Sequence, residues 1–180
     1  MNIAIIRNRK AAAGVIYVPD KDVRYYALNN LGSFKADSID DIESVIRQST
    51  GPATEIVTEA MENIIDASTA LPVKDSANRP FTIIGSRSHA SPELEAFVEE
   101  KRQEYGNVEF ISAGSSLKLC LVAEGKADID PRTGPTMEWD TAAGQAIAEN
   151  AGCKVLQYSP SDPLIYNKEN LLNPWFVVLR

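Results

Sequence analysis

GSSLKLCLVAEGKADIDPRTGPTMEWDTAAGQAIAENAG, residues 114–152, is the stretch that decides the fold. Small and helix-favouring residues follow Asp140 directly, and Gly152 ends the segment, so we expect Asp140 in the first turn of a helix. Unpaired backbone N–H groups and the positive end of the dipole can hold a phosphate there. The carboxylate can bind a divalent cation on that phosphate, although it could also simply cap the helix.

The residues upstream favour an anion site over a simple cap. Ser115 and Lys118 stand three apart on a segment that reads as a helix, so their side chains are expected on one face. Arg132 follows in a Pro-Arg-Thr-Gly-Pro loop before the Asp140 helix. A hydroxyl, two cations and a carboxylate suit an anionic ligand with a metal. A helix cap, a snorkelling lysine and a solvated loop arginine are the structural alternatives.

Three runs of residues carry a resemblance to a known family. They are Gly-Ser-Ser-Leu-Lys at 114–118, Ala-Glu-Gly-Lys-Ala-Asp at 123–128, and Pro-Arg-Thr-Gly-Pro-Thr-Met-Glu-Trp-Asp-Thr-Ala-Ala-Gly at 131–144. Together they resemble the 3′(2′),5′-bisphosphate nucleotidases of the inositol monophosphatase superfamily. The resemblance covers nearly the whole chain. It implies a layered α/β sugar-phosphatase fold and a magnesium-dependent phosphatase acting on 3′-phosphoadenosine 5′-phosphate, a by-product of sulfur assimilation.

The resemblance also assigns roles to particular residues. It implies that His89, Ser115, Lys118, Arg132 and Asp140 bind the nucleotide substrate, and that Asp140 is also a metal ligand for Mg²⁺. His89 is the single histidine, and a lone histidine after a strand could equally be a surface or capping residue. The family commonly has an aromatic residue where this chain has Asp130. Unless it faces away, a negative charge there should weaken anion binding by roughly 1 kcal/mol in a water-exposed cleft.

Two acidic runs of the family have no counterpart in these 180 residues. An Asp-Pro-x-Asp-Gly-Thr run and a Gly-Glu-Glu-type run supply most of the metal-binding carboxylates and the residue that activates water. The chain therefore resembles the later part of the enzyme. We expect it to contain no catalytic residue of its own, to be inactive alone, and to pair with a missing N-terminal half.

Two other functions stay open from the sequence. The chain could be a non-catalytic module that binds nucleotide or phosphate, or one half of a split enzyme. It could also belong to a phosphatase for inositol monophosphate or fructose bisphosphate, although the Ser-Ser-Leu-Lys and Pro-Arg contexts favour the nucleotide.

Composition limits the remaining classes. Hydrophobic residues make up 44% and charged residues 24%, as in globular proteins, and the net charge of −7 argues against a nucleic-acid partner. The sequence contains no apolar run long enough for a membrane span and no signal-peptide pattern, so we expect a cytoplasmic protein. The two cysteines, Cys120 and Cys153, are expected to be buried free thiols.

The order of the predicted elements indicates two lobes. Strands near residues 2–8, 11–19, 23–28 and 32–35 predict an antiparallel meander, followed by helices over 38–48 and 53–66. From Phe81 onward, strands alternate with helices, and Ser91 is the expected cap of the first one. We therefore predict the rest of an N-terminal lobe at residues 1–75 and a smaller α/β lobe at residues 76–180.

Overall fold

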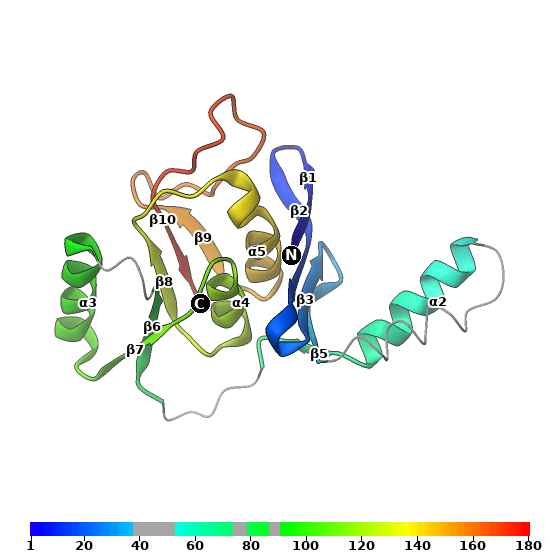
Figure 1. Ribbon diagram of the computed structural model, residues 1–180, viewed down its shortest axis with the longest axis horizontal. Coiled ribbons are helices and arrows are strands. Elements are labelled where there is room, and N and C mark those ends of the chain that lie inside the picture. The colour runs from blue at the N-terminus through cyan, green and yellow to red at the C-terminus, as the bar shows by residue number, and fades with distance from the viewer. Residues whose placement is uncertain (38–52, 74–78, 87–90) are drawn as a thin grey trace.

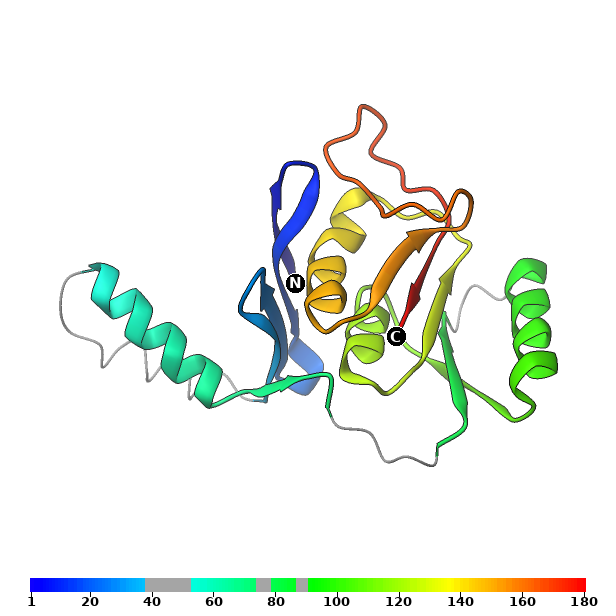
Figure 2. The same ribbon diagram turned by 180° about the vertical axis from the view of Figure 1, so that it is seen from behind.

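The computed structural model describes residues 1–37, 53–73, 79–86 and 91–180, with only the backbone described at 53–57. The helix predicted over residues 38–48 lies outside this part of the chain. Within it, two five-stranded sheets enclose a pair of helices, as Figures 1 and 2 show from opposite sides. The layered α/β fold predicted from the sequence is confirmed.

The first sheet is an antiparallel meander, as predicted. Its strands follow one another in chain order: β1 (Asn2–Arg7), β2 (Lys10–Val18), β3 (Val23–Leu28), β4 (Gly32–Asp37) and β5 (Thr69–Leu71). The short helical turn η1 (Pro19–Lys21) joins β2 to β3. Helix α2 (Ala53–Asp66) connects β4 to β5 and extends away from the body of the molecule (Figures 1 and 2).

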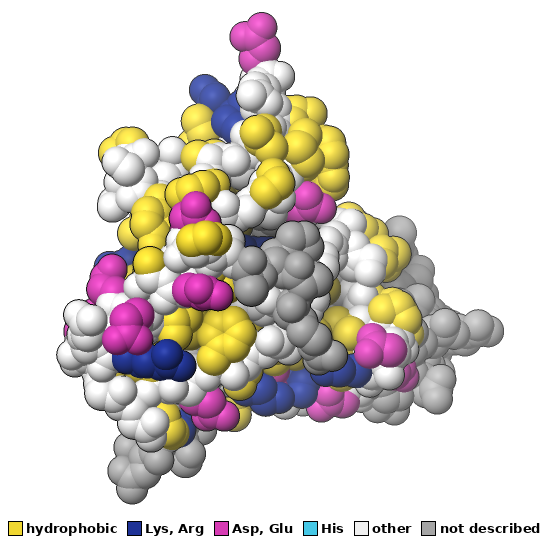
Figure 3. Space-filling model, turned by 60° about the vertical axis from the view of Figure 1, so that its left-hand side comes forward, with side chains coloured by type: hydrophobic (Ala, Val, Ile, Leu, Met, Phe, Trp, Pro, Cys, Tyr) yellow, Lys and Arg dark blue, Asp and Glu magenta, His cyan; other side chains and the backbone are white. Residues whose placement is uncertain are grey.

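The second sheet is mixed and has the order β7-β6-β8-β10-β9. Its strands are β6 (Phe81–Gly85), β7 (Val108–Ser112), β8 (Ile129–Arg132), β9 (Lys154–Gln157) and β10 (Phe176–Leu179). Helix α3 (Pro92–Tyr105) connects the parallel strands β6 and β7, and Ser91 caps it by accepting a hydrogen bond from the N–H of Leu94 at 3.3 Å. On the side that carries α3, acidic and basic side chains are mixed with hydrophobic ones (Figure 3).

Helices α4 (Leu117–Glu124) and α5 (Glu138–Asn150) lie between the two sheets (Figures 1 and 2). Ile16 of β2, Leu119 of α4 and Val178 of β10 belong to one hydrophobic core cluster. The first sheet ends at residue 71 and the second begins at residue 81, but one core spans both. The division into lobes at residue 75 therefore stays a prediction.

The two faces of the first sheet differ in exposure. Ile16 and Ala27 face the helices and are almost completely buried. The alternate residues point to the opposite face, where Ile3 pairs with Val15, and these side chains are 54% and 36% exposed. Ile5 and Leu28 extend this apolar outer face, and β1 is the edge strand beside it.

Gly14 fixes the distance between the first sheet and α5. A Cβ at this position would lie 2.8 Å from the Cα of Ala143, closer than real Cβ contacts come. Because backbone cannot move aside as a side chain can, we expect Gly14→Ala to lower the free energy of unfolding by about 1–3 kcal/mol. Urea denaturation would measure this loss.

Gly134→Ala is the matched control, since a Cβ there meets nothing within 4 Å. An equal loss of stability in both variants would contradict the close packing of β2 on α5.

Candidate functional site

One pocket of about 260 Å³ lies where α4, the end of β8 and the segment after β8 meet. Its lining includes three of the residues predicted from the sequence, Ser115, Lys118 and Arg132. Thr133 and Thr136 add two hydroxyl groups to the same lining. Two cations surrounded by hydrogen-bond donors suit an anionic ligand.

Lys118 is buried although it carries a charge. Its side chain comes from α4 and the residue is 2% exposed. The Nζ atom donates a hydrogen bond to the carbonyl oxygen of Ala113 at 3.4 Å, which is a long and weak contact. Burial, helped by the positive charge of Arg132 and opposed by Asp130, lowers the pKa of Lys118 to about 8. An anion in the pocket would stabilise its charged form.

Arg132 is the last residue of β8, so the prediction that it lies in a loop is wrong. The ladder with β10 continues through Pro131 and pairs Arg132 with Phe176, so the strand includes the Pro-Arg pair. The guanidinium lies 5.9 Å from the centre of the Phe176 ring, and its Nη2 donates a hydrogen bond to the carbonyl oxygen of Ser115 at 3.2 Å.

The prediction that Ser115 and Lys118 share a helix face is also wrong. Helix α4 begins at Leu117, and Ser115 precedes it with a φ of 48°, in the left-handed region. Such a φ turns the chain sharply before the helix. The turn still brings Ser115 to the pocket that Lys118 lines, and its carbonyl oxygen holds Arg132.

Asp140 lies in the first turn of α5, as predicted. Its Oδ2 accepts a hydrogen bond from the backbone N–H of Met137 at 2.8 Å, so the residue does cap the helix. The cap uses one of the two carboxylate oxygens. Asp140 is partly exposed but does not line the pocket of Lys118 and Arg132. Its role as a metal ligand therefore stays a prediction.

The acidic residues of the described ranges offer only part of a metal site. In the described ranges, no group of three or more His, Cys, Asp or Glu side chains could hold an ion. The Glu138 carboxylate accepts hydrogen bonds from the N–H groups of Asn167 and Lys168 and pairs with the Lys168 Nζ at 2.6 Å, so it is already engaged. Asp140 can supply an oxygen ligand of the kind that magnesium prefers, but only part of a complete set.

Gly144 brings the two candidate elements together. A Cβ at this position would lie 2.9 Å from Cδ2 of Leu119, the residue that follows Lys118 on α4. The glycine of the Trp-Asp-x-x-Ala-Gly run therefore lets α4 and α5 pack closely, so that one helix presents Lys118 and the other Asp140.

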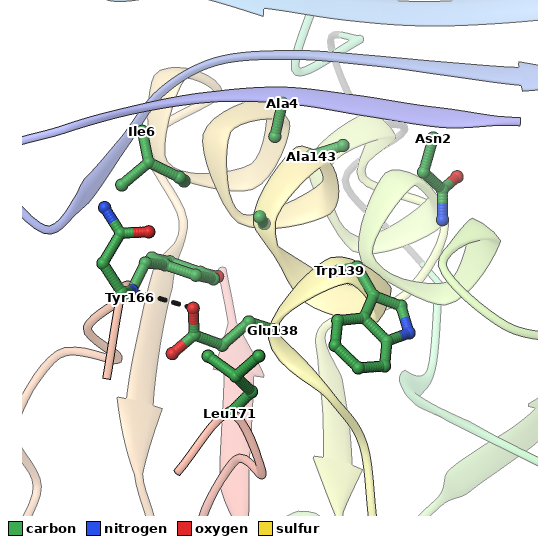
Figure 4. A pocket seen from close by; sticks show the side chains of 10 residues that line it. Asn2, Ala4, Ile6, Glu138, Trp139, Ala143, Tyr166 and Leu171 are labelled. Carbon is green, nitrogen blue, oxygen red and sulfur yellow. Dashed lines mark hydrogen bonds between the residues drawn. The ribbon is translucent and has the colours of Figure 1, made fainter. Parts of the chain in front are cut away.

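A second pocket, of about 310 Å³, lies between edge strand β1 and the start of α5 (Figure 4). Ala4 and Ile6 of β1 face Ala143 and the exposed Trp139 across it. The sequence analysis missed this pocket because its lining is mostly apolar. A tryptophan beside an acidic residue was the available signal, and its ring proves to be 59% exposed.

Two further residues complete the comparison with the sequence. His89 lies outside the described part of the chain, so its place at the pocket stays a prediction. Asp130 was expected beside the phosphate subsite, but it is fully buried behind the pocket, with its Oδ2 at 3.3 Å from Nε of Arg132.

None of the helices in the described part of the chain combines the length and apolar composition needed to cross a bilayer. Cys120 and Cys153 are buried and unpaired, as predicted.

Curated relatives match almost the whole chain. The 3′(2′),5′-bisphosphate nucleotidase CysQ of Escherichia coli is 36% identical over 179 residues, which are 99% of this chain and 58% of that protein. The protein of the same name from Haemophilus influenzae is 27% identical over 98% of this chain and 55% of its own length. The chain thus spans little more than half the length of these relatives.

Solved structures give the same result. The crystal structure of CysQ from Bacteroides thetaiotaomicron, a bacterial member of the inositol monophosphatase family, superposes with a TM-score of 0.84 at 45% identity. That match covers 99% of this chain and 61% of the other. A staphylococcal IMPase-II shares the fold, with a TM-score of 0.65 at 21% identity over 99% of this chain and 57% of its own. The model of the inositol monophosphatase family matches residues 1–175, and the chain therefore belongs to that family.

Proposed function

We propose that this chain is the later part of a magnesium-dependent phosphatase that removes the 3′-phosphate of 3′-phosphoadenosine 5′-phosphate, leaving AMP and phosphate. The observation that carries the proposal is the pair of cations, Lys118 and Arg132, that line one pocket in a chain 36% identical to a bisphosphate nucleotidase. A cytoplasmic role in sulfur metabolism, which generates this nucleotide, belongs to the same proposal.

The residues of this chain bind and orient the substrate in this proposal. Lys118 and Arg132 hold a phosphate group by charge-assisted hydrogen bonds, with the hydroxyl of Ser115 beside them. His89 contacts the nucleotide. Asp140 holds magnesium at the start of α5, where unpaired backbone N–H groups favour a neighbouring phosphate. Magnesium, when bound, supplies the positive charge that stabilises a leaving oxygen and lowers the pKa of a bound water.

In this proposal, a further polypeptide segment completes the site. It corresponds to the part of the relatives that this chain does not match. Two surfaces support this part of the proposal. The outer face of the first sheet exposes Ile3, Ile5 and Val15, and apolar sheet faces are usually covered. The pocket between β1 and α5 opens beside the exposed Trp139, next to the unpaired edge of the sheet. A strand added along β1 would fill that pocket and approach Asp140.

The assay compares two proteins, the 180-residue chain and the same chain preceded by the N-terminal part of the E. coli relative that it does not match. Phosphate release from adenosine 3′,5′-bisphosphate with magnesium is measured for each. Loss of a residue that only hydrogen-bonds to a metal ligand already costs 10- to 100-fold in activity. We therefore expect the rate of the chain without most of the metal ligands to fall more than about a hundredfold below that of the longer protein.

Inositol monophosphate and fructose 1,6-bisphosphate serve as competing substrates in the same assay. A longer protein that prefers either of them would refute the nucleotide assignment. Comparable rates for the two proteins would refute the proposed incompleteness.

A non-catalytic binding module is the second candidate. The absence of a three-residue metal cluster in the described ranges favours it for the isolated chain. Calorimetry with adenosine 3′,5′-bisphosphate separates the two functions, because a module binds the nucleotide whether or not the longer protein turns it over.

A further inference from the structure

Asp130 is a buried carboxylate without the usual hydrogen bonds. It is 0% exposed, and in the described part of the chain neither Oδ1 nor Oδ2 accepts a hydrogen bond. Buried polar groups are almost always satisfied, since an unpaired one costs free energy. A carboxylate left in this condition directly behind a pocket therefore needs an explanation.

The strand places Asp130 between the two cations of the pocket. Asp130 and Arg132 are two residues apart on β8, so both side chains point to the same face of the sheet. Lys118 approaches from α4. Lys118 and Arg132 are the two charged groups that affect the pKa of Asp130, and both lower it. The neighbouring strand β10 contributes Val178 and Phe176, which pair with Asp130 and Arg132 and are apolar. Ile84 of β6 belongs to the same hydrophobic core cluster.

The ion pair between Asp130 and Arg132 has two consequences for the pocket. Its Nε lies 3.3 Å from Oδ2 of Asp130, while its Nη2 donates to the carbonyl oxygen of Ser115 at 3.2 Å. The guanidinium is therefore fixed from two sides at the rim of the pocket. The negative charge also offsets one of the two positive charges that a bound anion would meet, which lowers the attraction for that anion.

We propose that Asp130 is a specificity-determining positioning residue of this pocket. It orients Arg132, and its negative charge offsets one of the two positive charges of the pocket until an anion and a proton bind together. The inference rests on the proposed function only in assigning the pocket to a phosphate group. A phosphate-type anion raises the proton affinity of the carboxylate behind it, so the pocket takes up a proton as the anion enters.

The protonation of Asp130 lies in an accessible pH range. Burial raises the pKa of Asp130 to about 6, against the opposing effects of Arg132 and Lys118. Near neutral pH the carboxylate is largely ionised in the free chain, and a bound anion shifts it towards the neutral form. Anion binding should therefore strengthen as the pH falls from 7 towards 5, and proton uptake should accompany it.

The test uses calorimetric titration of the 180-residue chain with sulfate and with adenosine 3′,5′-bisphosphate. Sulfate is the primary probe because it carries no titrating proton in this pH range. Titrations at about pH 6.5 in two buffers with different ionisation enthalpies give the number of protons bound with the anion. We expect net uptake of a substantial fraction of a proton by the unaltered chain.

Asp130→Asn should abolish this uptake and flatten the pH dependence between 5 and 7. It should also bind sulfate about tenfold more tightly, because an interior negative charge has been removed. The control is Asp162→Asn, which makes the same change of net charge at an exposed position. Its sulfate affinity and proton uptake should equal those of the unaltered chain.

The outcomes separate the two proposals. Binding of sulfate without proton uptake by the unaltered chain would overturn the role of Asp130, and this measurement requires no variant to fold. An Asp130→Asn variant with unchanged affinity and pH profile would overturn it as well. If neither sulfate nor the nucleotide binds at all, the anion pocket itself is refuted, and the proposed function fails with it.

Discussion

Asp140→Asn should abolish the phosphatase activity proposed for the longer protein while leaving the fold intact. The side-chain amide oxygen of asparagine can accept a hydrogen bond as the carboxylate does, so the hydrogen bond from the N–H of Met137 can be kept. It lacks the charge that a magnesium ligand provides. Loss of a direct ligand should exceed the 10- to 100-fold cost of losing a residue that only hydrogen-bonds to a ligand, so we expect phosphatase activity to fall more than about a hundredfold.

The measurement is phosphate release over a range of magnesium concentrations by the chain joined to the N-terminal part of the E. coli relative that it does not match. Glu149→Gln is the control, because it makes the same change of charge near the other end of α5. Its activity should stay within about twofold of the unaltered protein, since surface charges this distant are screened. Full activity of Asp140→Asn at ordinary magnesium concentrations would remove the metal ligand from the proposal.

Lys118→Met should weaken nucleotide binding without weakening the fold. A charge-assisted hydrogen bond contributes about 1.5–3 kcal/mol, so the dissociation constant for adenosine 3′,5′-bisphosphate should rise roughly 10- to 100-fold. Methionine fills a similar volume and removes the poorly compensated ammonium of a residue that is 2% exposed. The thermal midpoint should therefore stay the same or rise.

The pH dependence of binding tests the same residue independently. Burial lowers the pKa of Lys118 to about 8, so its positive charge is present below that pH and lost as the pH rises through it. Nucleotide affinity of the unaltered chain should fall across this range, and Lys118→Met should lack this fall. Lys154→Met, at an exposed position on β9, is the control and should behave as the unaltered chain. Equal affinities for the two variants would exclude Lys118 from the site.

The sequence predicts most of the fold because its local signals agree with the final packing. Turn residues between β-branched segments marked the meander, and Ser91 with Pro92 marked the start of α3. The glycine at 152 adopts a φ of 88° just after α5, as a helix stop requires. These features are set within a few residues along the chain, so pattern alone identifies them.

The errors occurred where distant parts of the chain decide the local structure. Pairing with Phe176, more than 40 positions further along, extends β8 to Arg132, and no pattern near Pro131 indicates this. The left-handed turn at Ser115 is equally hidden, because a serine carries no sign of a positive φ. Burial of Asp130 also depends on packing between a strand and α4, so the sequence alone could not decide whether this side chain faces the pocket or away from it.

Helix α5 is enclosed between two sheets, with backbone contacting it at Gly14 and a leucine filling the space at Gly144. The rim of the anion pocket, by contrast, includes Gly134 and Pro135, which are open to solvent. Substitutions in the rim can therefore accumulate during evolution without disturbing the helix that carries Asp140. Within such an architecture, the residues that surround a bound anion can change while the helix that carries Asp140 stays the same.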